Sequence, residues 1–161
     1  MSNTNILHDS VPQIGRLAWI GLAPTKQAPI QVVESARVEV GSGLVGDHHA
    51  TSGQTSQRQV TLIQAEHLPV IASLCQLESI DPKLLRRNLV VSGINLLSLK
   101  KRRFRVGDAT LEGTGPCAPC SLMEKNLGPG GYQAMRGHGG ITAIVHEAGT
   151  INVGDQIQVF D

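Results

Sequence analysis

The fold is decided by the stretch RFRVGDATLE at residues 103–112, in which two short strand-like runs flank a turn. The runs cover residues 103–106 and 109–112. Gly107-Asp108 supplies the turn, because glycine and aspartate suit the tight connections of hairpins. The same Val-Gly-Asp tripeptide recurs at residues 153–155, just before another strand-like run. Both copies therefore predict hairpin turns.

Short strands with few helices continue along the rest of the chain. Strands are predicted at residues 14–22, 31–40, 58–63, 88–91, 141–146 and 156–160, and RQVTLI at 58–63 is the clearest because of its β-branched residues. Helices are predicted at residues 66–77, where Leu68, Ile71 and Cys75 share a face, at 81–85 and after Cys120. This pattern predicts an α+β, mainly β domain, with a barrel-like fold of mostly antiparallel strands rather than a doubly wound sheet.

The composition is that of one globular domain. The chain has 161 residues and a net charge of +1, and aromatics are only 2%, so Val, Ile, Leu and Ala must build the core. One domain is predicted at residues 14–161, after a loose polar segment at residues 1–13. We expect no membrane partner and a cytoplasmic location, because the sequence has neither an apolar span nor a secretion signal. Three cysteines, an odd number, favour reduced thiols over a disulfide scaffold.

Two cysteines, Cys117 and Cys120, lie three positions apart in the turn TGPCAPC at residues 114–120. A helix predicted from Ser121 places Cys120 beside a helix N-terminus, where backbone N–H groups favour an anion such as a thiolate. Thiolates act as nucleophiles, sulfur carriers and soft-metal ligands. The pair also fits a redox dithiol, a zinc half-site completed by histidines, one reactive thiol with a spectator, or two buried small residues.

Other segments carry side chains suited to ligand binding. Arg86, Arg87 and Asn88 enter a short apolar strand, and such groups can hold phosphate or a heterocycle, although an edge strand with solvated arginines fits as well. GDHH at residues 46–49 can bind metal or transfer protons, and GHGG at 137–140 can bring backbone N–H groups to an anion. A polar surface loop and a long turn are the simpler interpretations of these two segments.

The basic run KKRRFR at residues 100–105 can bind an anion or RNA. One aromatic residue interrupts it, whereas platforms for single-stranded nucleic acid need more aromatics. The near-neutral net charge also gives no general attraction to polyanions. We therefore expect no nucleic-acid partner, and a solvated loop is the favoured interpretation of this run.

Taken together, these segments resemble the MOSC domain family, whose domain is also found at the C-terminus of molybdenum cofactor sulfurases. The resemblance runs from about residue 41 to residue 159. It rests on GDH at 46–48, RQVTLI at 58–63, RRNLVVSG at 86–93, Pro119-Cys120, GHGG at 137–140 and INVGD at 151–155. It implies a barrel-like domain with a shallow cleft that binds a pyranopterin molybdenum cofactor or carries sulfur as a cysteine persulfide.

The resemblance also implies roles for single residues. Cys120 matches the family's key cysteine, and so it is the candidate molybdenum ligand or persulfide carrier. Arg86 and Asn88 match an Arg-x-Asn pattern expected to grip the pterin and its phosphate, with Arg87 in the variable middle position. His48, His138 and Gly139 lie in family-like segments and are further candidates for cofactor binding. Cys117, the second thiol of the segment, is not a position that the whole family shares.

Three functions are compatible with these observations. A molybdenum-cofactor-dependent enzyme, reducing N-hydroxylated compounds as some relatives do, would need a separate electron-donor protein because the chain has no flavin or iron–sulfur motif. A sulfur carrier would accept sulfur from a donor protein and deliver it to a metallosulfur centre. A binding module for RNA or another anion would rest on Arg86, Arg87 and the basic run at residues 100–105.

Overall fold

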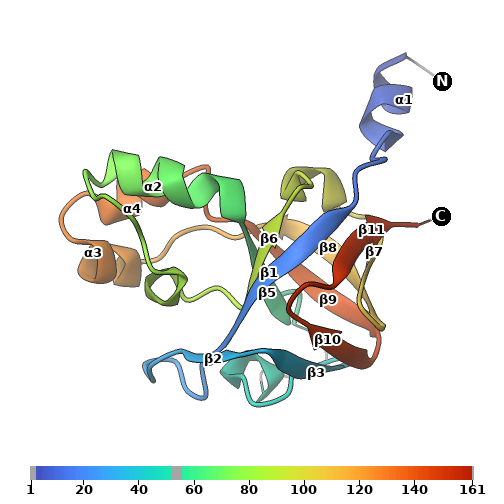
Figure 1. Ribbon diagram of the computed structural model, residues 1–161, viewed down its shortest axis with the longest axis horizontal. Helices are drawn as coiled ribbons and strands as arrows, with labels where there is room; N and C mark the ends of the chain where they lie inside the picture. Colours follow the sequence, from blue (N-terminus) through green and yellow to red (C-terminus); the bar gives the residue numbers. More distant parts are fainter. Residues whose placement is uncertain (1–2, 52–55, 161) are drawn as a thin grey trace.

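A mostly antiparallel β-barrel forms the body of the molecule (Figure 1), in a computed structural model that describes residues 3–51 and 56–160. The main sheet has eight strands in the order β11-β7-β8-β9-β5-β6-β1-β2, and β11 also pairs with β1, so that seven of them close into a barrel. Within this sheet β5 and β6 are parallel, and the other neighbouring pairs are antiparallel. The bounds are β1 Gly15–Leu22, β2 Gln31–Val33, β5 Val60–Gln64, β6 Leu89–Ser92, β7 Arg103–Val106, β8 Ala109–Pro116, β9 Ile141–Glu147 and β11 Gln156–Val159. The predicted fold class is confirmed.

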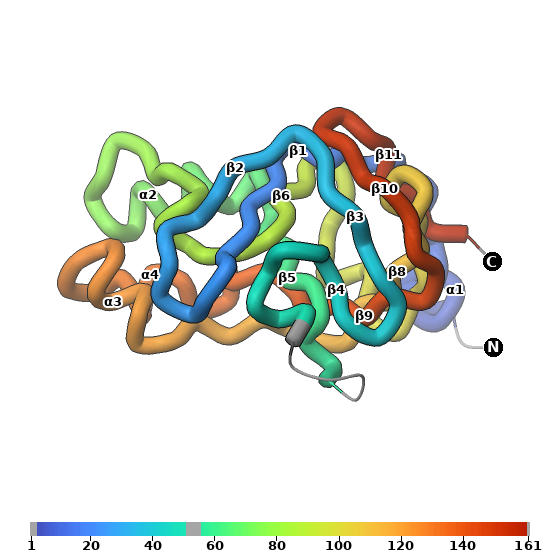
Figure 2. Tube along the Cα trace, turned by 90° about the horizontal axis from the view of Figure 1, so that it is seen from below, coloured from blue at the N-terminus to red at the C-terminus, as the bar shows by residue number. Residues whose placement is uncertain are grey.

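A second, three-stranded sheet in the order β10-β3-β4 lies against the barrel. Its strands are β3 Ser35–Glu39, β4 Gly43–Leu44 and β10 Gly149–Asn152. Figure 2 shows β3 and β10 side by side although they are far apart in the sequence. β10 was not predicted, whereas β3 falls within the strand predicted at residues 31–40.

The Val-Gly-Asp turn at residues 106–108 is a hairpin, as predicted. β7 and β8 pair across it, from Arg103 opposite Glu112 to Val106 opposite Ala109. Gly107 in their turn has φ +53°, and a Cβ there would lie 2.2 Å from the Asp155 carboxylate oxygen, so glycine is favoured at this position. The turn at residues 153–155 is not a hairpin, because it joins β10 to β11, which belong to different sheets and pair with other strands. β8 runs four residues beyond its predicted end, to Pro116, and this extension carries the chain to Cys117.

Two apolar clusters fill the molecule, one inside the barrel and one between the barrel and the helices. Phe104, Leu17 and Leu111 belong to the first, whereas Ile71, Leu85, Met123 and Met135 belong to the second. β5 and β6 contribute to both, because successive side chains of a strand point to opposite faces. The helical side comprises α2 Leu68–Leu74, α3 Ser121–Leu127, α4 Gly131–Met135 and the 3-10 turn η3 Pro82–Leu85.

Helical segments differ from the prediction in several places. The helix predicted at residues 66–77 divides into the 3-10 turn η2 Ala65–His67 and the shorter α2, with Cys75 half-buried after its end. The segment expected to be loose contains α1 Asn3–Asp9, none of whose residues is buried. It lies on the same side of the barrel as β11, away from α2, α3 and α4 (Figures 1 and 2). Two more 3-10 turns are η1 His48–Thr51 and η4 Leu96–Leu99. The sequence after GDHH is rich in Ser, Thr and Gln up to Gln57 and also predicts a polar loop, but this part lies partly outside the described residues.

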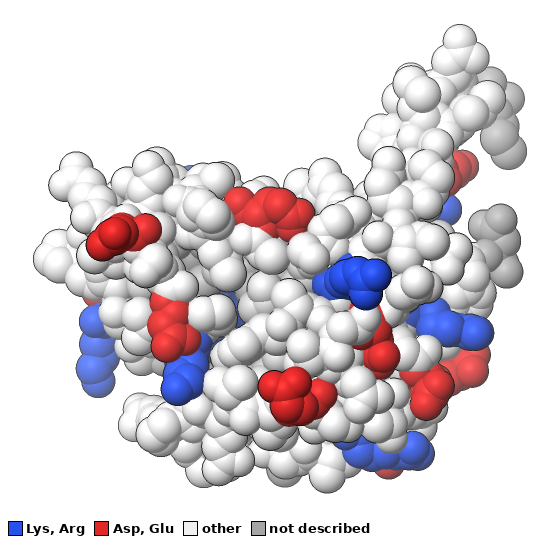
Figure 3. Space-filling view, viewed as in Figure 1, with Lys and Arg blue, Asp and Glu red and all other residues white. Residues whose placement is uncertain are grey.

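Charged side chains of both signs are interspersed over the face shown in Figure 3. This mixture agrees with the net charge of +1. No helix in the described ranges is both long and apolar enough to cross a membrane.

Candidate functional site

The Cys117–Cys120 segment connects the end of β8 to the start of α3. Cys120 is the N-cap residue of α3 with extended backbone angles, φ −121° and ψ 173°, which is the predicted position. Cys120 is exposed, whereas Cys117 is buried and its backbone N–H donates to the Gly140 carbonyl at 2.8 Å. Burial, with a smaller contribution from the Glu124 carboxylate, raises the pKa of the third thiol, Cys75. Cys120 is therefore the thiol best placed to meet a ligand or a partner.

The guanidinium of Arg87 lies beneath this connection and is only 2% exposed. Its Nε–H donates to the Gly139 carbonyl at 2.9 Å, and Nη1 donates to Leu85 at 3.1 Å. Nη2 donates to the carbonyls of Cys117 and Ala118, both at 3.4 Å. Arg87 thus ties the cysteine segment to the glycine-rich segment at residues 137–140.

No carboxylate forms an ion pair with Arg87 in the part of the chain that the structure describes. Burial lowers the pKa of Arg87, while the neighbouring thiols of Cys117 and Cys120 act in the opposite direction because their thiolate forms would favour the cation. A buried cation without an acidic partner favours an anion nearby. Among the described residues, the thiols of Cys117 and Cys120 are the neighbouring groups that can become anions.

Arg86 holds a different segment. It has left-handed backbone angles, φ 56° and ψ 33°, after η3. Its guanidinium donates to the carbonyls of Ala28 at 2.8 Å, Lys26 at 3.0 Å and Thr25 at 3.3 Å. Arg86 therefore fixes the loop between β1 and β2, and Ala23 at the start of this loop contacts Asp47 and His48.

The side chain of Asn88 is 2% exposed and bonded on every side. Its Oδ1 accepts from the Thr61 N–H at 3.1 Å and the Thr61 hydroxyl at 3.2 Å. Its Nδ2 donates to the Gly21 carbonyl at 3.2 Å and to Asp47 Oδ1 at 3.0 Å. These bonds make Asn88 a positioning residue that joins β5, β1 and Asp47.

Replacing Asn88 with alanine is expected to lower the free energy of unfolding by about 2 kcal/mol, because buried donors and acceptors on Thr61 and Asp47 lose their partner. Urea denaturation at pH 7 measures the change. Asn152→Ala, at an exposed position in β10, is the matched control and is expected to change stability by less than about 0.5 kcal/mol. Equal stability of the two variants would contradict the positioning role.

Asp47 is a buried residue of the candidate site that the sequence analysis did not single out. The interpretation of residues 46–49 as a polar surface loop is wrong for Asp47, which is 3% exposed. Its Oδ1 accepts from the Ala23 N–H at 2.7 Å as well as from Asn88, and its Oδ2 accepts from His49 at the backbone N–H (3.1 Å) and at Nδ1 (2.8 Å). Burial alone would raise the pKa of Asp47, but these hydrogen bonds outweigh it and the pKa lies below its usual value.

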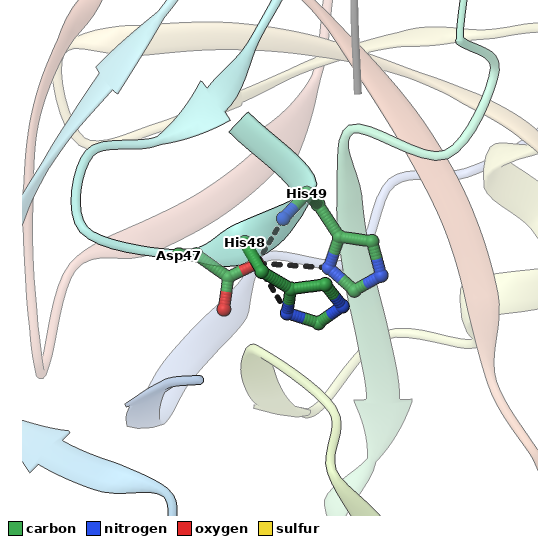
Figure 4. Close-up of side chains that lie close together, drawn as sticks. All are labelled: Asp47, His48 and His49. Carbon is green, nitrogen blue, oxygen red and sulfur yellow. Dashed lines mark hydrogen bonds and ion pairs between the residues drawn. The ribbon is translucent and has the colours of Figure 1, made fainter. Parts of the chain in front are cut away.

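His48 and His49 stand beside Asp47 at the start of η1 (Figure 4). Their ring centroids are 4.0 Å apart, and His48 Nδ1 lies 3.1 Å from the Ala23 carbonyl oxygen. Burial lowers the pKa of His48, and nearby His49 and Arg86 act in the same direction. The charge of Arg86 therefore acts on His48, and a shared role of the two residues in binding a cofactor stays a prediction.

The structure places His138 differently. Its ring packs edge-on against His67 at 5.2 Å between centroids, and its Nδ1 is buried without a hydrogen-bond partner among the described residues. A cleft of about 610 Å³ nearby is lined by His67, Gln64 and Glu66 among others, and it does not include Cys120.

Gly139, the residue after His138, does contact the cysteine segment, because a Cβ there would lie 2.1 Å from the Cys117 carbonyl oxygen.

Comparison with known proteins agrees with this architecture. The family model of the MOSC domain matches residues 45–158. The structure is similar to that of YuaD from Bacillus subtilis, with 23% sequence identity and a TM-score of 0.78 over 93% of this chain and 98% of that chain. It is also similar to that of YiiM from Escherichia coli, with 17% sequence identity and a TM-score of 0.69 over 91% of this chain and 70% of that chain. For YiiM from Geobacillus stearothermophilus the identity is 14% and the TM-score 0.74, over 91% of this chain and 75% of that chain. No curated protein matches. With the family model spanning well over half of its length, the chain belongs to the MOSC domain family.

Proposed function

We propose that this chain binds a pyranopterin molybdenum cofactor, with the thiolate of Cys120 as the protein's ligand to molybdenum. The observation that carries the proposal is an exposed thiol, Cys120, in a connection whose Cys117 and Ala118 carbonyls are held by the buried guanidinium of Arg87. Molybdenum prefers soft ligands, and a thiolate is soft and anionic. The fixed charge of Arg87 stabilises such an anion within the connection between β8 and α3.

The donor set fits this group, with roles that differ from the resemblance. Cys120 would bind the metal, and Arg87 would supply the charge. The resemblance assigns Arg86 and Asn88 to the pterin and its phosphate. In the structure both side chains donate hydrogen bonds to other groups of the protein instead. We assign them to shaping the site, Arg86 through the loop at residues 25–28 and Asn88 through Asp47. When bound, the cofactor supplies the redox change, and reduction of N-hydroxylated compounds would draw electrons from a separate donor protein.

A sulfur carrier is the second candidate, and the exposure of Cys120 favours it. The Cys120 thiolate would attack the outer sulfur of a donor protein's persulfide, and the donor's thiolate would leave. The product is a persulfide anion on Cys120, again beside Arg87. Transfer to a metallosulfur centre needs a thiol that another protein can reach, and the buried Cys117 does not offer one.

Metal and sulfur analysis of cysteine variants tests both candidates. The wild type, Cys120→Ser and the control Cys75→Ser would be purified anaerobically from a host that makes the cofactor, and molybdenum and zinc would be measured per chain. We expect molybdenum in the wild type and in Cys75→Ser, and background levels in Cys120→Ser. A persulfide at Cys120 in mass spectra, with no molybdenum, would replace the first candidate by the second. Neither adduct nor metal at Cys120 would contradict both.

A further inference from the structure

The basic run at residues 100–105 makes the charge of this chain uneven. It holds five of the 14 Lys and Arg residues, namely Lys100, Lys101, Arg102, Arg103 and Arg105. With these five set aside, nine Lys and Arg remain against 13 Asp and Glu, so the rest of the chain has a net charge of −4. The total of +1 therefore combines a strongly basic segment with an acidic remainder, and such an asymmetry orients the approach of a charged partner.

The structure places most of this basic run at a cleft of about 930 Å³ beside α1. Four of its cations, those of residues 100–103, line the cleft together with Leu97 and Phe160. These two apolar side chains are 62% and 38% exposed. The size of the cleft falls within the range of about 300–1,000 Å³ that is usual for ligand pockets. The lining therefore suits an anionic ligand that also carries apolar groups.

A fixed turn holds Lys100 and Lys101 at the edge of this cleft. Lys101 has a left-handed backbone with φ +60°, and its N–H donates to the Gly113 carbonyl at 2.8 Å. The next N–H, that of Arg102, donates to the Leu99 carbonyl at 3.0 Å. The two exposed lysines thus extend from a backbone that is bonded to its neighbours on both sides.

Carboxylates of the chain neutralise part of this charge. Arg102 lies 3.5 Å from the Asp9 carboxylate and also donates to backbone carbonyls at the end of α1, which it holds at the cleft. Arg103 lies 4.0 Å from the Glu112 carboxylate. The two lysines of the turn form no ion pair within residues 3–51 and 56–160. Their charge is therefore available to a ligand.

The shape and chemistry of the cleft favour a peptide over other polyanions. Phe160 is the only Phe, Tyr or Trp in the described lining, and Arg105 already lies over its ring at 5.1 Å. Single-stranded nucleic acid is bound on several stacking aromatics. A lipid surface is flat, whereas these cations line a concavity. An extended peptide can enter a cleft and meet a cluster of cations with its carboxylates.

We propose that this cleft binds an acidic segment of another protein, whose carboxylates pair with the two lysines of the turn and with Arg103. An apolar side chain of the segment contacts Leu97 and Phe160. The elements that border the cleft, α1, β7 and β11, lie at the end of the molecule opposite α3, which Cys120 precedes (Figures 1 and 2). A partner bound there leaves Cys120 uncovered, so the cleft attaches the chain to another protein without blocking its reactive thiol.

Fluorescence anisotropy of a labelled synthetic peptide of glutamates and leucines, titrated with the full chain, tests the proposal. We expect saturable binding of one peptide per chain, weakened at least about tenfold between about 50 and 200 mM NaCl because exposed charges are screened. The double variant Lys100→Glu, Lys101→Glu is expected to weaken binding at least about tenfold, since like charges then meet the peptide. Leu97→Ala is expected to weaken it about threefold through the loss of apolar contact.

The double variant Lys83→Glu, Lys125→Glu is the matched control, because both lysines are exposed, lie outside the cleft and give the same change in net charge. It is expected to bind like the wild type, as is Cys120→Ser, so the result does not depend on the cofactor proposed above. Circular dichroism checks the fold of each variant. Absence of saturable binding, equal weakening by the two double variants, or unchanged binding by Leu97→Ala would overturn the proposal. Tighter binding of labelled oligouridine or of phosphatidylserine vesicles than of the peptide would overturn it as well.

Discussion

Replacing Arg87 with methionine is expected to lower the free energy of unfolding by about 3–4 kcal/mol. Methionine has a similar length but no donors, so the carbonyls of Leu85, Cys117, Ala118 and Gly139 lose their shared partner. The cysteine connection and the glycine-rich segment are then no longer tied together. Urea denaturation measures the loss of stability, and molybdenum or persulfide bound at Cys120 is expected to fall with it because the stabilising positive charge is gone.

Arg103→Met is the matched control for Arg87→Met. The Arg103 side chain is 55% exposed, and its nearest carboxylate, that of Glu112, is 4.0 Å away. Exposed ion pairs contribute little, so we expect a change below about 1 kcal/mol. If the two arginine variants lost the same amount of stability, the buried hydrogen bonds of Arg87 would not be what holds the cysteine segment.

Replacing Gly139 with alanine is expected to cost about 3 kcal/mol, because the added Cβ has no room. It would lie 2.1 Å from the Cys117 carbonyl oxygen and 3.3 Å from Arg87 Nη2. The first of these is a backbone atom, so the cysteine segment as a whole must shift, and Cys120 is three residues further along it. Thermal unfolding measures the destabilisation, and metal or sulfur analysis measures the accompanying loss at Cys120.

Gly115→Ala provides the comparison, in the same strand that leads to Cys117. A Cβ at Gly115 meets nothing within 4 Å. We expect its stability to stay within about 0.5 kcal/mol of the wild type, and Cys120 to keep its ligand. An alanine at residue 139 that leaves both stability and ligand unchanged would show that the Gly139 contact does not position the cysteine segment.

Local signals explain what could be predicted from the sequence. The β7–β8 hairpin depends on a turn between neighbouring runs, and the position of Cys120 depends on the helix that follows it. Both signals lie within ten residues of the feature they predict, and both features are present. β10 was missed because its residues Gly149–Asn152 are few and it gains its partner β3 from far away in the chain.

The interior of the site was harder to predict because its bonds join distant residues. Asp47 accepts from Ala23, 24 residues earlier, and from Asn88, 41 residues later. Arg87 reaches Gly139 across 52 residues. The neighbouring sequence of a polar residue is the same whether its side chain is exposed to solvent or buried with hydrogen-bond partners. For this reason GDHH was interpreted as a surface loop. The sequence signal that could have marked Asp47 was its position directly before two histidines. That signal alone does not show burial, because Asp47 is held in the interior by a hydrogen bond from the distant Asn88.

The pairing of β1 with β11 that closes the barrel has a consequence for synthesis of the protein. Gly15 pairs with Ile157, so this part of β1 cannot form its backbone hydrogen bonds to β11 until β11 has emerged from the ribosome. Contacts of such long sequence separation slow folding, because the entropy of loop closure is lost before the contact forms. Throughout that interval the open edge of β1 can pair with strands of other nascent chains. A chaperone that binds the nascent chain would therefore be most useful between the emergence of these two strands.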